Sequence, residues 1–222
     1  MKRSPIAVLL CVLLHCAATS EASVTVTKGE PARDQKTFDP KNPPPNVKPH
    51  LEGGFAAYTS SEFAVGWQTS FSVEELPAAA DRSTRVRVTV RGLEVTLSLT
   101  TTLWLPTNAD KRIVDHEQGH RTIAEHYYAS ADGRARRVAE AMVGQQVEGT
   151  GGTSEAAQQD ASKQLQRQWQ ERFFNAVNQS SKGAQERFDK MTKHGTVLTL
   201  SVDDAVRRSI AEQDEADAKA KP

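Results

Sequence analysis

The sequence has little cysteine, few aromatic residues and no excess of charge of either sign. Its 222 residues include two cysteines, Cys11 and Cys16, and aromatic residues make up 6% of the chain. Lysine plus arginine and aspartate plus glutamate number 28 each, so the formal net charge at pH 7 is zero. A charge-balanced chain lacks the basic surface that attracts nucleic acid or an anionic membrane. We therefore expect no nucleic-acid partner.

Long apolar runs are also lacking after the start of the chain. The one sustained run, residues 6–18, is shorter than the roughly 20 residues that a membrane-spanning helix needs. It follows Lys2 and Arg3 and precedes a small-x-small pattern at residues 20–22, which is typical of a secretory signal peptide. We predict that residues 1–22 are a cleavable signal and that the protein is secreted or periplasmic. Both cysteines lie in this segment, so the mature chain would have no disulfide.

Three segments are expected after the signal peptide. Residues 23–50 are rich in proline and charge, most densely at residues 39–45. Because proline has no amide hydrogen and cannot continue a helix or a sheet interior, we interpret this segment as an extended arm. It is either a tether or a segment that lies along the domain. Residues 51–201 are predicted to form a single domain, and residues 202–222 a polar C-terminal helix or tail.

The first part of the predicted domain has the alternation of strands. Residues 85–91 and 93–100 alternate strictly between apolar and polar, with Gly92 between them. This pattern predicts an antiparallel hairpin with one buried face. Residues 64–67 and 71–73 predict a further strand.

From Pro106 onward the pattern is mostly helical. The predicted helices cover residues 111–130, 134–147, 154–181 and 182–193. A glycine-rich break is expected at residues 149–152, a strand at residues 196–201, and a polar helix or frayed tail at residues 203–220. The predicted fold class is α+β, a small antiparallel sheet packed against a helical half.

The most informative feature is the H-E-x-x-H sequence His116-Glu117-Gln118-Gly119-His120. Residues four apart on an α-helix lie on one face, about 6 Å apart along the axis, so both imidazoles can bind one zinc ion. Glu117 would lie beside that ion as the general base toward water. The simpler interpretation is a surface helix with two unrelated histidines and a solvated glutamate. Because histidine is scarce elsewhere in the chain, we favour the zinc site and a zincin-like helical half.

The flanking residues predict a helix independently of the motif. Thr107 or Asn108 can cap its start, and Asp110 lies near the positive end of the helix dipole. The helix is expected to end at residues 131–133, where Gly133 can adopt the left-handed conformation of a C-terminal cap. Apolar residues recur at helical spacing, namely Ile113, Val114, Ile123, Ala124 and Tyr127.

A catalytic zinc site needs a third protein ligand, and three residues near the motif are candidates. His126 and Glu125 follow on the same helix, but in an unbroken helix both point away from His120. Glu140 lies on the next predicted helix, as does the third ligand of thermolysin-like zinc peptidases. With two nearby arginines, Glu140 also fits a solvated helix face with an ion pair, which is the commoner arrangement.

A further histidine, His194, lies in the segment Phe188-Asp189-Lys190-Met191-Thr192-Lys193-His194-Gly195. Together with the strand pair before Leu105 and the H-E-x-x-H helix, this segment resembles a family of bacterial proteins described as predicted secreted zinc-dependent proteases. The resemblance covers roughly residues 86–195. The chain departs from the family pattern at Phe188, where tyrosine is usual, and at Met191, where an acidic residue is usual. The resemblance implies that His194 is the third zinc ligand. Glu140, proposed from its place on the next helix, is the runner-up.

Three residues are predicted to support the site. Asp189 can orient a ligand histidine through its second nitrogen, and Tyr127, or its neighbour Tyr128, can donate a hydrogen bond to an oxyanion. Glu125 is predicted to contact a ligand side chain without binding the metal, or to lie at the surface. Each also has an ordinary explanation as a packed or solvated side chain. The three tryptophans are expected to pack the core or cover its rim, at Trp67, Trp104 and Trp169.

Two functions fit these observations. The first is a secreted or periplasmic zinc-dependent metallopeptidase, with Zn²⁺ held by His116, His120 and His194 and with Glu117 as general base. Its partner would be a peptide or protein substrate, docked along the sheet edge near residues 97–104. The second is a non-catalytic exported binding or scaffold protein, with a structural zinc or no metal.

Overall fold

The structure, a computed structural model, describes residues 23–53, 55–77, 83–196 and 200–220. The predicted signal peptide and part of the predicted strand at residues 196–201 lie outside the described residues. Contacts within the chain form two compact units whose segments alternate along the sequence. The first unit comprises the described part of Met1–Lys28, Ala64–Leu97 and Ala131–Ala176. The second comprises Gly29–Phe63, Ser98–Ser130 and the described part of Val177–Pro222.

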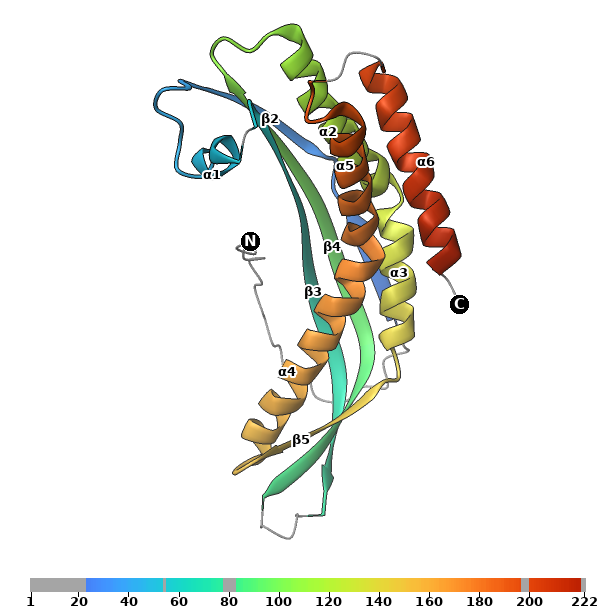
Figure 1. Cartoon of the computed structure of the whole chain (residues 1–222). Helices are drawn as coiled ribbons and strands as arrows, with labels where there is room; N and C mark the ends of the chain where they lie inside the picture. The colour runs from blue at the N-terminus through green and yellow to red at the C-terminus, as the bar shows by residue number, and fades with distance from the viewer. Residues whose placement is uncertain (1–22, 54, 78–82, 197–199, 221–222) are drawn as a thin grey trace. The chain divides into compact units, whose positions relative to one another are not determined.

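Among the described residues the fold is α+β, with a five-stranded mixed sheet. Its strands are β1 (Ser23–Lys28), β2 (Ala32–Phe38), β3 (Tyr58–Leu76), β4 (Thr84–Pro106) and β5 (Gln146–Gly151). All four other strands pair with β4 (Figure 1). β1 and β2 are parallel to it and β5 is antiparallel. The predicted antiparallel sheet is therefore wrong in that two of its pairings are parallel.

The two parallel strands come from the segment that we interpreted as an arm. The dense prolines at residues 39–45 follow β2. In the link between β1 and β2 the one proline is Pro31. The amide groups of both strands are therefore available for pairing. Ser23 is opposite Gly92, and Ala32 is opposite Thr100. The first half of the segment thus belongs to the sheet as β1 and β2, and its end begins the short helix at Lys48–Glu52.

The predicted hairpin at Gly92 is wrong, because β4 runs through this glycine without a turn. The buried positions change at this point from even to odd numbers, with Val90 and Leu93 both buried. A shift of one residue in the alternation looks in the sequence like the boundary between two strands. Gly92 permits close approach instead, since a Cβ there would lie 2.8 Å from the Ser23 carbonyl oxygen.

In the first unit, two helices accompany the strands, α3 (Ala131–Met142) and α4 (Ser154–Phe173). α4 lies against β5, where the sequence predicted a glycine-rich break (Figure 1). Gly149 is a residue of β5. Because it has no side chain, the backbone of α4 can approach the strand at this point. Gly133 is also not a cap as predicted, since α2 ends before it and Gly133 lies inside α3.

The second unit contains the short helix α1 (Lys48–Glu52) and three longer helices, α2 (Lys111–Ala129), α5 (Gln179–Thr192) and α6 (Val202–Ala220). The longer helices lie side by side (Figure 1) and enclose a core. That core consists of Ile123, Tyr127, Ala184, Phe188, Ala205 and Val206. The predicted boundary near residues 181–182 is instead a π-helical turn, η1 (Phe174–Asn178), and α5 follows it directly.

α2 begins one turn later than the predicted caps would place it. The cap is Asp110, whose carboxylate accepts a hydrogen bond of 2.9 Å from the Ile113 amide, and neither Thr107 nor Asn108 serves. The apolar start of α2 packs against the end of β4. Ile113 and Val114 contact a cluster that includes Leu103 and Leu105. This contact fixes the first turn of the helix that carries the histidine motif.

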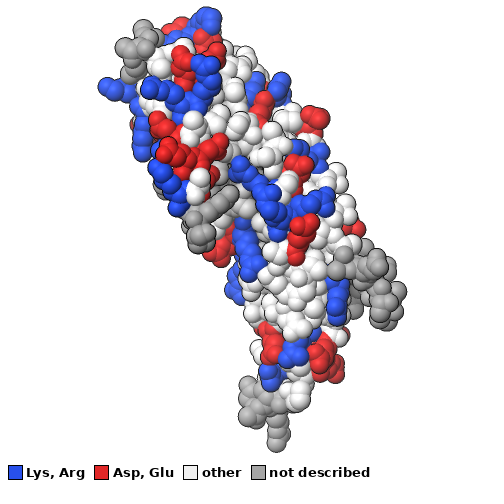
Figure 2. Space-filling model, turned by 90° about the vertical axis from the view of Figure 1, so that its right-hand side faces the viewer, with Lys and Arg blue, Asp and Glu red and all other residues white. Residues whose placement is uncertain are grey.

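Acidic and basic side chains are interspersed on the face of the molecule shown in Figure 2. Several acidic and basic side chains of the described residues form ion pairs, as Arg85 does with Glu148 at 2.6 Å and Lys111 with Asp115 at 2.6 Å. This surface agrees with the charge balance of the sequence. In the part of the chain that the structure describes, no helix is both long and apolar enough to cross a membrane.

Replacing Gly149 by alanine is expected to lower the free energy of unfolding by about 1–3 kcal/mol, the usual cost of overpacking. The new Cβ would lie 2.0 Å from the Ala157 carbonyl oxygen and 2.7 Å from the Ala161 nitrogen. Gly152→Ala is the matched control, because among the described residues nothing beyond its chain neighbours lies within 4 Å of that Cβ. Its effect should stay within about 0.5 kcal/mol. Urea unfolding followed by circular dichroism measures both, and equal midpoints would contradict the packing of α4 on β5.

Candidate metal centre

His116 and His120 lie on one face of α2, as the spacing of the motif predicts. Their Nε2 atoms are 3.2 Å apart, and their ring centroids are 4.8 Å apart. His116 is 5% exposed, so its imidazole is almost fully removed from water. Two buried nitrogen atoms at this separation face a common point.

Asp189, on α5, brings a carboxylate to the same point. Its Oδ1 lies 3.0 Å from His120 Nε2 and 3.4 Å from His116 Nε2. His116, His120 and Asp189 thus form a group in which the ligand atoms all lie within 4.8 Å of one another. Such a group could bind a metal ion. Asp189 is therefore more central than its predicted supporting role.

His194 lies at the edge of this group. Its Nδ1 is 3.3 Å from Asp189 Oδ1, and its side chain is 47% exposed. The backbone holds it there in an unusual way, because Lys193 and His194 both have left-handed conformations, with φ of 44° and 54°. The amides of both residues bond to the Asp189 carbonyl oxygen. The structure therefore brings the predicted third ligand beside the group rather than into it.

One unsatisfied atom of the group fits a metal site. Asp189 Oδ1 is buried and has no hydrogen-bond partner among the described residues. Buried polar atoms are usually hydrogen-bonded, so an exception indicates a missing ion or water. Ligands about 2.0–2.1 Å from a tetrahedral zinc ion lie about 3.3–3.4 Å from one another. The separations within the group, 3.2, 3.0 and 3.4 Å, are close to that spacing.

Gln185, one turn before Asp189 on α5, orients His120. Its amide nitrogen donates to the His120 carbonyl oxygen at 3.1 Å, which fixes the amide so that its oxygen contacts His120 Nδ1. An amide oxygen only accepts, so Nδ1 carries the proton and the Nε2 lone pair faces the group. Burial acts to lower the pKa of His120, but the contact with Asp189 and the charges of Asp189 and Glu117 outweigh it and raise that pKa.

Glu117 is buried beside the histidines, and Thr59 on β3 holds its carboxylate. The Thr59 hydroxyl donates to Glu117 Oε2 at 2.6 Å and also lies 3.1 Å from the Glu117 carbonyl oxygen. Burial raises the pKa of Glu117, against the opposing effects of His120, Thr59 and His116. The pKa of Asp189 moves the other way, because its contacts with the histidines outweigh its burial. The two carboxyl groups therefore have different proton affinities.

Phe188 and Gly119 explain how α5 comes so close to α2. A Cβ at Gly119 would lie 2.5 Å from the Phe188 ring. The ring instead stacks on His116 at a centroid distance of 4.8 Å and meets His120 edge-on at 4.9 Å. The glycine of the motif therefore leaves space for the Phe188 ring, which contacts both imidazoles.

The remaining predicted residues do other things. Glu125 forms a two-bond ion pair with Arg33 on β2, at 2.6 and 2.7 Å. Tyr127 is buried and donates to Asp214 at 3.0 Å, and Tyr128 donates to the Gly29 carbonyl oxygen at 2.8 Å. Glu140, the runner-up ligand, lies on α3 in the first unit and is not part of the group. The tyrosines and Glu125 thus hold the second unit together.

The other predicted side chains have packing roles or none at this site. His126 is exposed on α2, as the geometry of an unbroken helix predicts. Trp67 and Trp169 are core residues of the first unit, with ring centroids 5.5 Å apart. Trp104 is half-buried in the second unit, with the Lys36 ammonium 5.0 Å from its ring centroid.

Sequence reasoning missed Gln185 and Thr59 and ranked Asp189 too low. Gln185 and Asp189 are four residues apart, so a helix over residues 179–192 places both on one face. That spacing was the available signal. No comparable signal exists for Thr59, because its contact with Glu117 depends on how β3 meets α2.

Comparisons with family models, with curated proteins and with solved structures found no match to this chain. The family resemblance stated from the sequence therefore stays a prediction. The observation that stands is local, a histidine pair and a carboxylate that could bind a metal ion.

Lys193→Gly is expected to raise the free energy of unfolding by about 1 kcal/mol, because a left-handed L-residue costs roughly 1–2 kcal/mol and glycine largely avoids that cost. The control is the same substitution at Lys182, which is exposed in the interior of α5. There glycine should lower stability by about 0.5–1 kcal/mol. Thermal or urea unfolding gives both values. Destabilisation by Lys193→Gly would contradict the left-handed turn.

Proposed function

We propose that the protein is a zinc-dependent metallopeptidase in which His116, His120 and Asp189 hold the metal. The observation that supports this most directly is the convergence of three ligand atoms beside a buried glutamate. Two imidazole nitrogens and one carboxylate oxygen are a donor set of the kind found in catalytic zinc sites. One oxygen of the Asp189 carboxylate is buried without a hydrogen-bond partner among the described residues, and a cation bound there would compensate its negative charge.

Glu117 is the proposed general base. Zinc bound by the group would polarise an amide carbonyl and lower the pKa of a water molecule. Burial raises the pKa of Glu117 above the ordinary value of a glutamate, against the opposing effects of His120, Thr59 and His116. Thr59 fixes the carboxylate, so Glu117 can take a proton from the attacking water and pass it to the leaving amine. Peptides and proteins are the proposed substrates.

We propose Asp189 as the third ligand, with His194 at the rim of the site. Catalytic zinc sites have three protein ligands and one open position, whereas structural sites have four. His194 is about half exposed and contacts the ring of Phe55 edge-on at 4.5 Å, which suits a residue that meets substrate. The assignment of His194 as third ligand, predicted from the sequence, stays an alternative that the same experiment tests.

A second function has one observation in its favour. His194 Nδ1 is only 3.3 Å from Asp189 Oδ1, so a small movement would let His194 bind as a fourth protein ligand. Zinc with four protein ligands is closed to water and substrate. The protein would then be a non-catalytic binding or scaffold protein stabilised by its metal. In either case we propose that it acts outside the cytoplasm, on the basis of the signal-like residues 1–22.

The metal proposal predicts one zinc ion per chain in protein purified without chelator, measured by inductively coupled plasma mass spectrometry. His116→Ala and Asp189→Ala should both lose it, because each removes a ligand. His126→Ala is the matched control, since His126 is exposed on the same helix. Retention of zinc by His194→Ala would favour the open site with Asp189 as third ligand, and loss in both His194→Ala and Asp189→Ala would favour the closed site. Loss in His194→Ala alone would make His194 the third ligand. Full retention by Asp189→Ala would exclude Asp189 as a ligand.

Glu117→Gln should keep the zinc and lower peptide hydrolysis by about 10²–10⁴-fold, the usual contribution of a general base. Glu125→Gln on the same helix is the control, because Glu125 pairs with Arg33 away from the group. A fluorogenic peptide library supplies the substrate, and zinc analysis confirms that both variants are loaded. Equal turnover by the wild type and Glu117→Gln would refute the proposed mechanism.

A further inference from the structure

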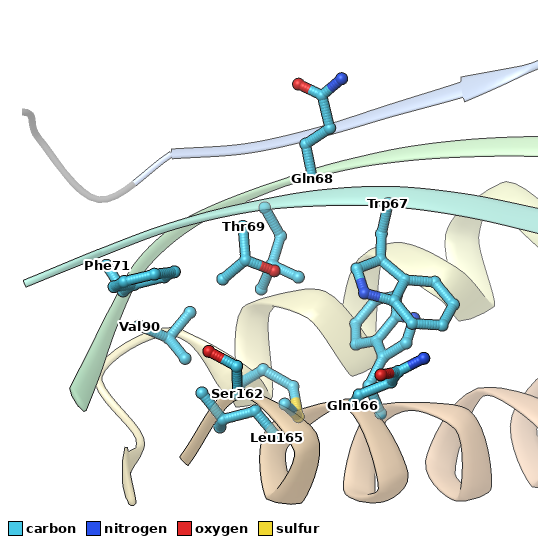
Figure 3. Close-up of a pocket in the computed structure, with 11 residues that line it drawn as sticks. Trp67, Gln68, Thr69, Phe71, Val90, Ser162, Leu165 and Gln166 are labelled. Atoms are coloured by element: carbon cyan, nitrogen blue, oxygen red, sulfur yellow. The ribbon is translucent and has the colours of Figure 1, made fainter. Parts of the chain in front are cut away.

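The cavity of the first unit offers no group for chemistry. It has a volume of ≈ 50 Å³, and its lining residues, shown in Figure 3, are mainly apolar and aromatic. Among them are Trp67 and Phe71 on β3 and Leu165 on α4, and none is a histidine, a cysteine or a charged residue. In the second unit, by contrast, a glycine lies directly against one of the histidines of the candidate metal centre.

This glycine, Gly195, approaches the imidazole of His116 with its bare backbone. A Cβ at Gly195 would lie 3.2 Å from His116 Cγ and 3.3 Å from His116 Cβ, closer than most side chains pack. Gly195 also has a φ of 78°, a left-handed conformation that glycine adopts without steric cost. The position and the conformation of this residue therefore both require glycine.

The His116 ring has no room to move away from Gly195. It stacks on Phe188 and meets His120 edge-on, each at 4.8 Å between ring centroids. Its Nε2 lies 3.4 Å from Asp189 Oδ1. Phe188 is fully buried and is itself packed against Gly119. A displaced ring would therefore leave the orientation in which Nε2 faces Asp189 and His120.

The turn that carries Gly195 is also held in place. The amides of Lys193 and His194 both bond to the Asp189 carbonyl oxygen, the latter at 3.1 Å. Thr196 donates twice to the Lys193 carbonyl oxygen, from its amide at 3.2 Å and from its hydroxyl at 2.7 Å. A side-chain torsion is softer than this set of backbone bonds. A Cβ at position 195 would therefore displace the imidazole rather than the turn.

We propose that Gly195 is a positioning residue, which keeps the His116 imidazole in the orientation that joins it to His120 and Asp189. Metal ligands depend on the neighbours that orient them, and changing such a neighbour typically weakens metal binding about 10–100-fold. The consequence for metal binding rests on the proposed function, whereas the orientation of the ring does not.

The first measurement needs no metal. In a ¹H–¹³C spectrum of the metal-free protein the ring current of Phe188 should shift the His116 ring protons, whose signals His116→Asn identifies. Gly195→Ala should move these signals. Gly144→Ala is the matched control, because Gly144 has a φ of 81° and, among the described residues beyond its chain neighbours, nothing within 4 Å of its Cβ. It introduces a similar backbone strain and should leave the His116 signals in place.

The second measurement is the Kd for Zn²⁺, from competition with a chelating dye. Gly195→Ala should raise it about 10–100-fold, and Gly144→Ala should leave it unchanged. Gly195→Asn keeps the test valid if Gly195→Ala is misfolded, because asparagine adopts a positive φ more readily, and it should also bind zinc more weakly.

Unmoved His116 signals in both Gly195 variants, or wild-type zinc affinity in both, would overturn the proposal. If the wild type binds no zinc while the His116 signals respond as expected, the proposed function fails and the role of Gly195 in orienting the ring stands.

Discussion

The candidate site depends on the close packing of the Phe188 ring against Gly119, which has no side chain. Phe188 occupies the space that any residue larger than glycine would fill at Gly119, and this brings α5 against the histidine face of α2. Gln185 and Asp189 are then carried to His120, because they lie on the same side of α5 as Phe188. A side chain at Gly119 would separate the helices, and the histidines would lose their orienting amide and their carboxylate together.

The two acidic side chains beside this contact differ in proton affinity, and their position next to two imidazoles favours a cation. Two carboxyl groups, Asp189 and Glu117, lie close to the imidazoles of His116 and His120, and the environment pushes their pKa values in opposite directions. Carboxyl groups separated in this manner are typical of sites in which one is a permanent anion and the other exchanges a proton. The lowered pKa of Asp189 favours its anion, and its Oδ1 lies 3.0 Å from His120 Nε2 and 3.4 Å from His116 Nε2.

The helix, the histidine pair and the adjacent glutamate could be predicted from the sequence because they depend on spacing within about 20 residues of one helix. Thr59 could not be found, and Asp189 was predicted as a supporting residue rather than a member of the group, since their contacts join elements distant in the chain. The errors in the sheet have a common cause. Gly92 and Gly149 were interpreted as turn and break, whereas both are strand glycines that let another backbone approach. Proline density at residues 39–45 likewise concealed the two strands before it.

The turn at Lys193 and His194 is the strained part of the backbone beside the candidate site. Two consecutive left-handed L-residues are costly, and such strain persists only where the surroundings hold it. Both amides bond to one carbonyl oxygen, that of Asp189, so the residue that supplies the carboxylate also anchors the strained turn. A turn under strain releases energy when it relaxes, and relaxation would move His194 relative to a carboxylate that α5 keeps in place. His194 thus lies on a strained turn beside the group, whereas His116, His120 and Asp189 lie on the helices α2 and α5.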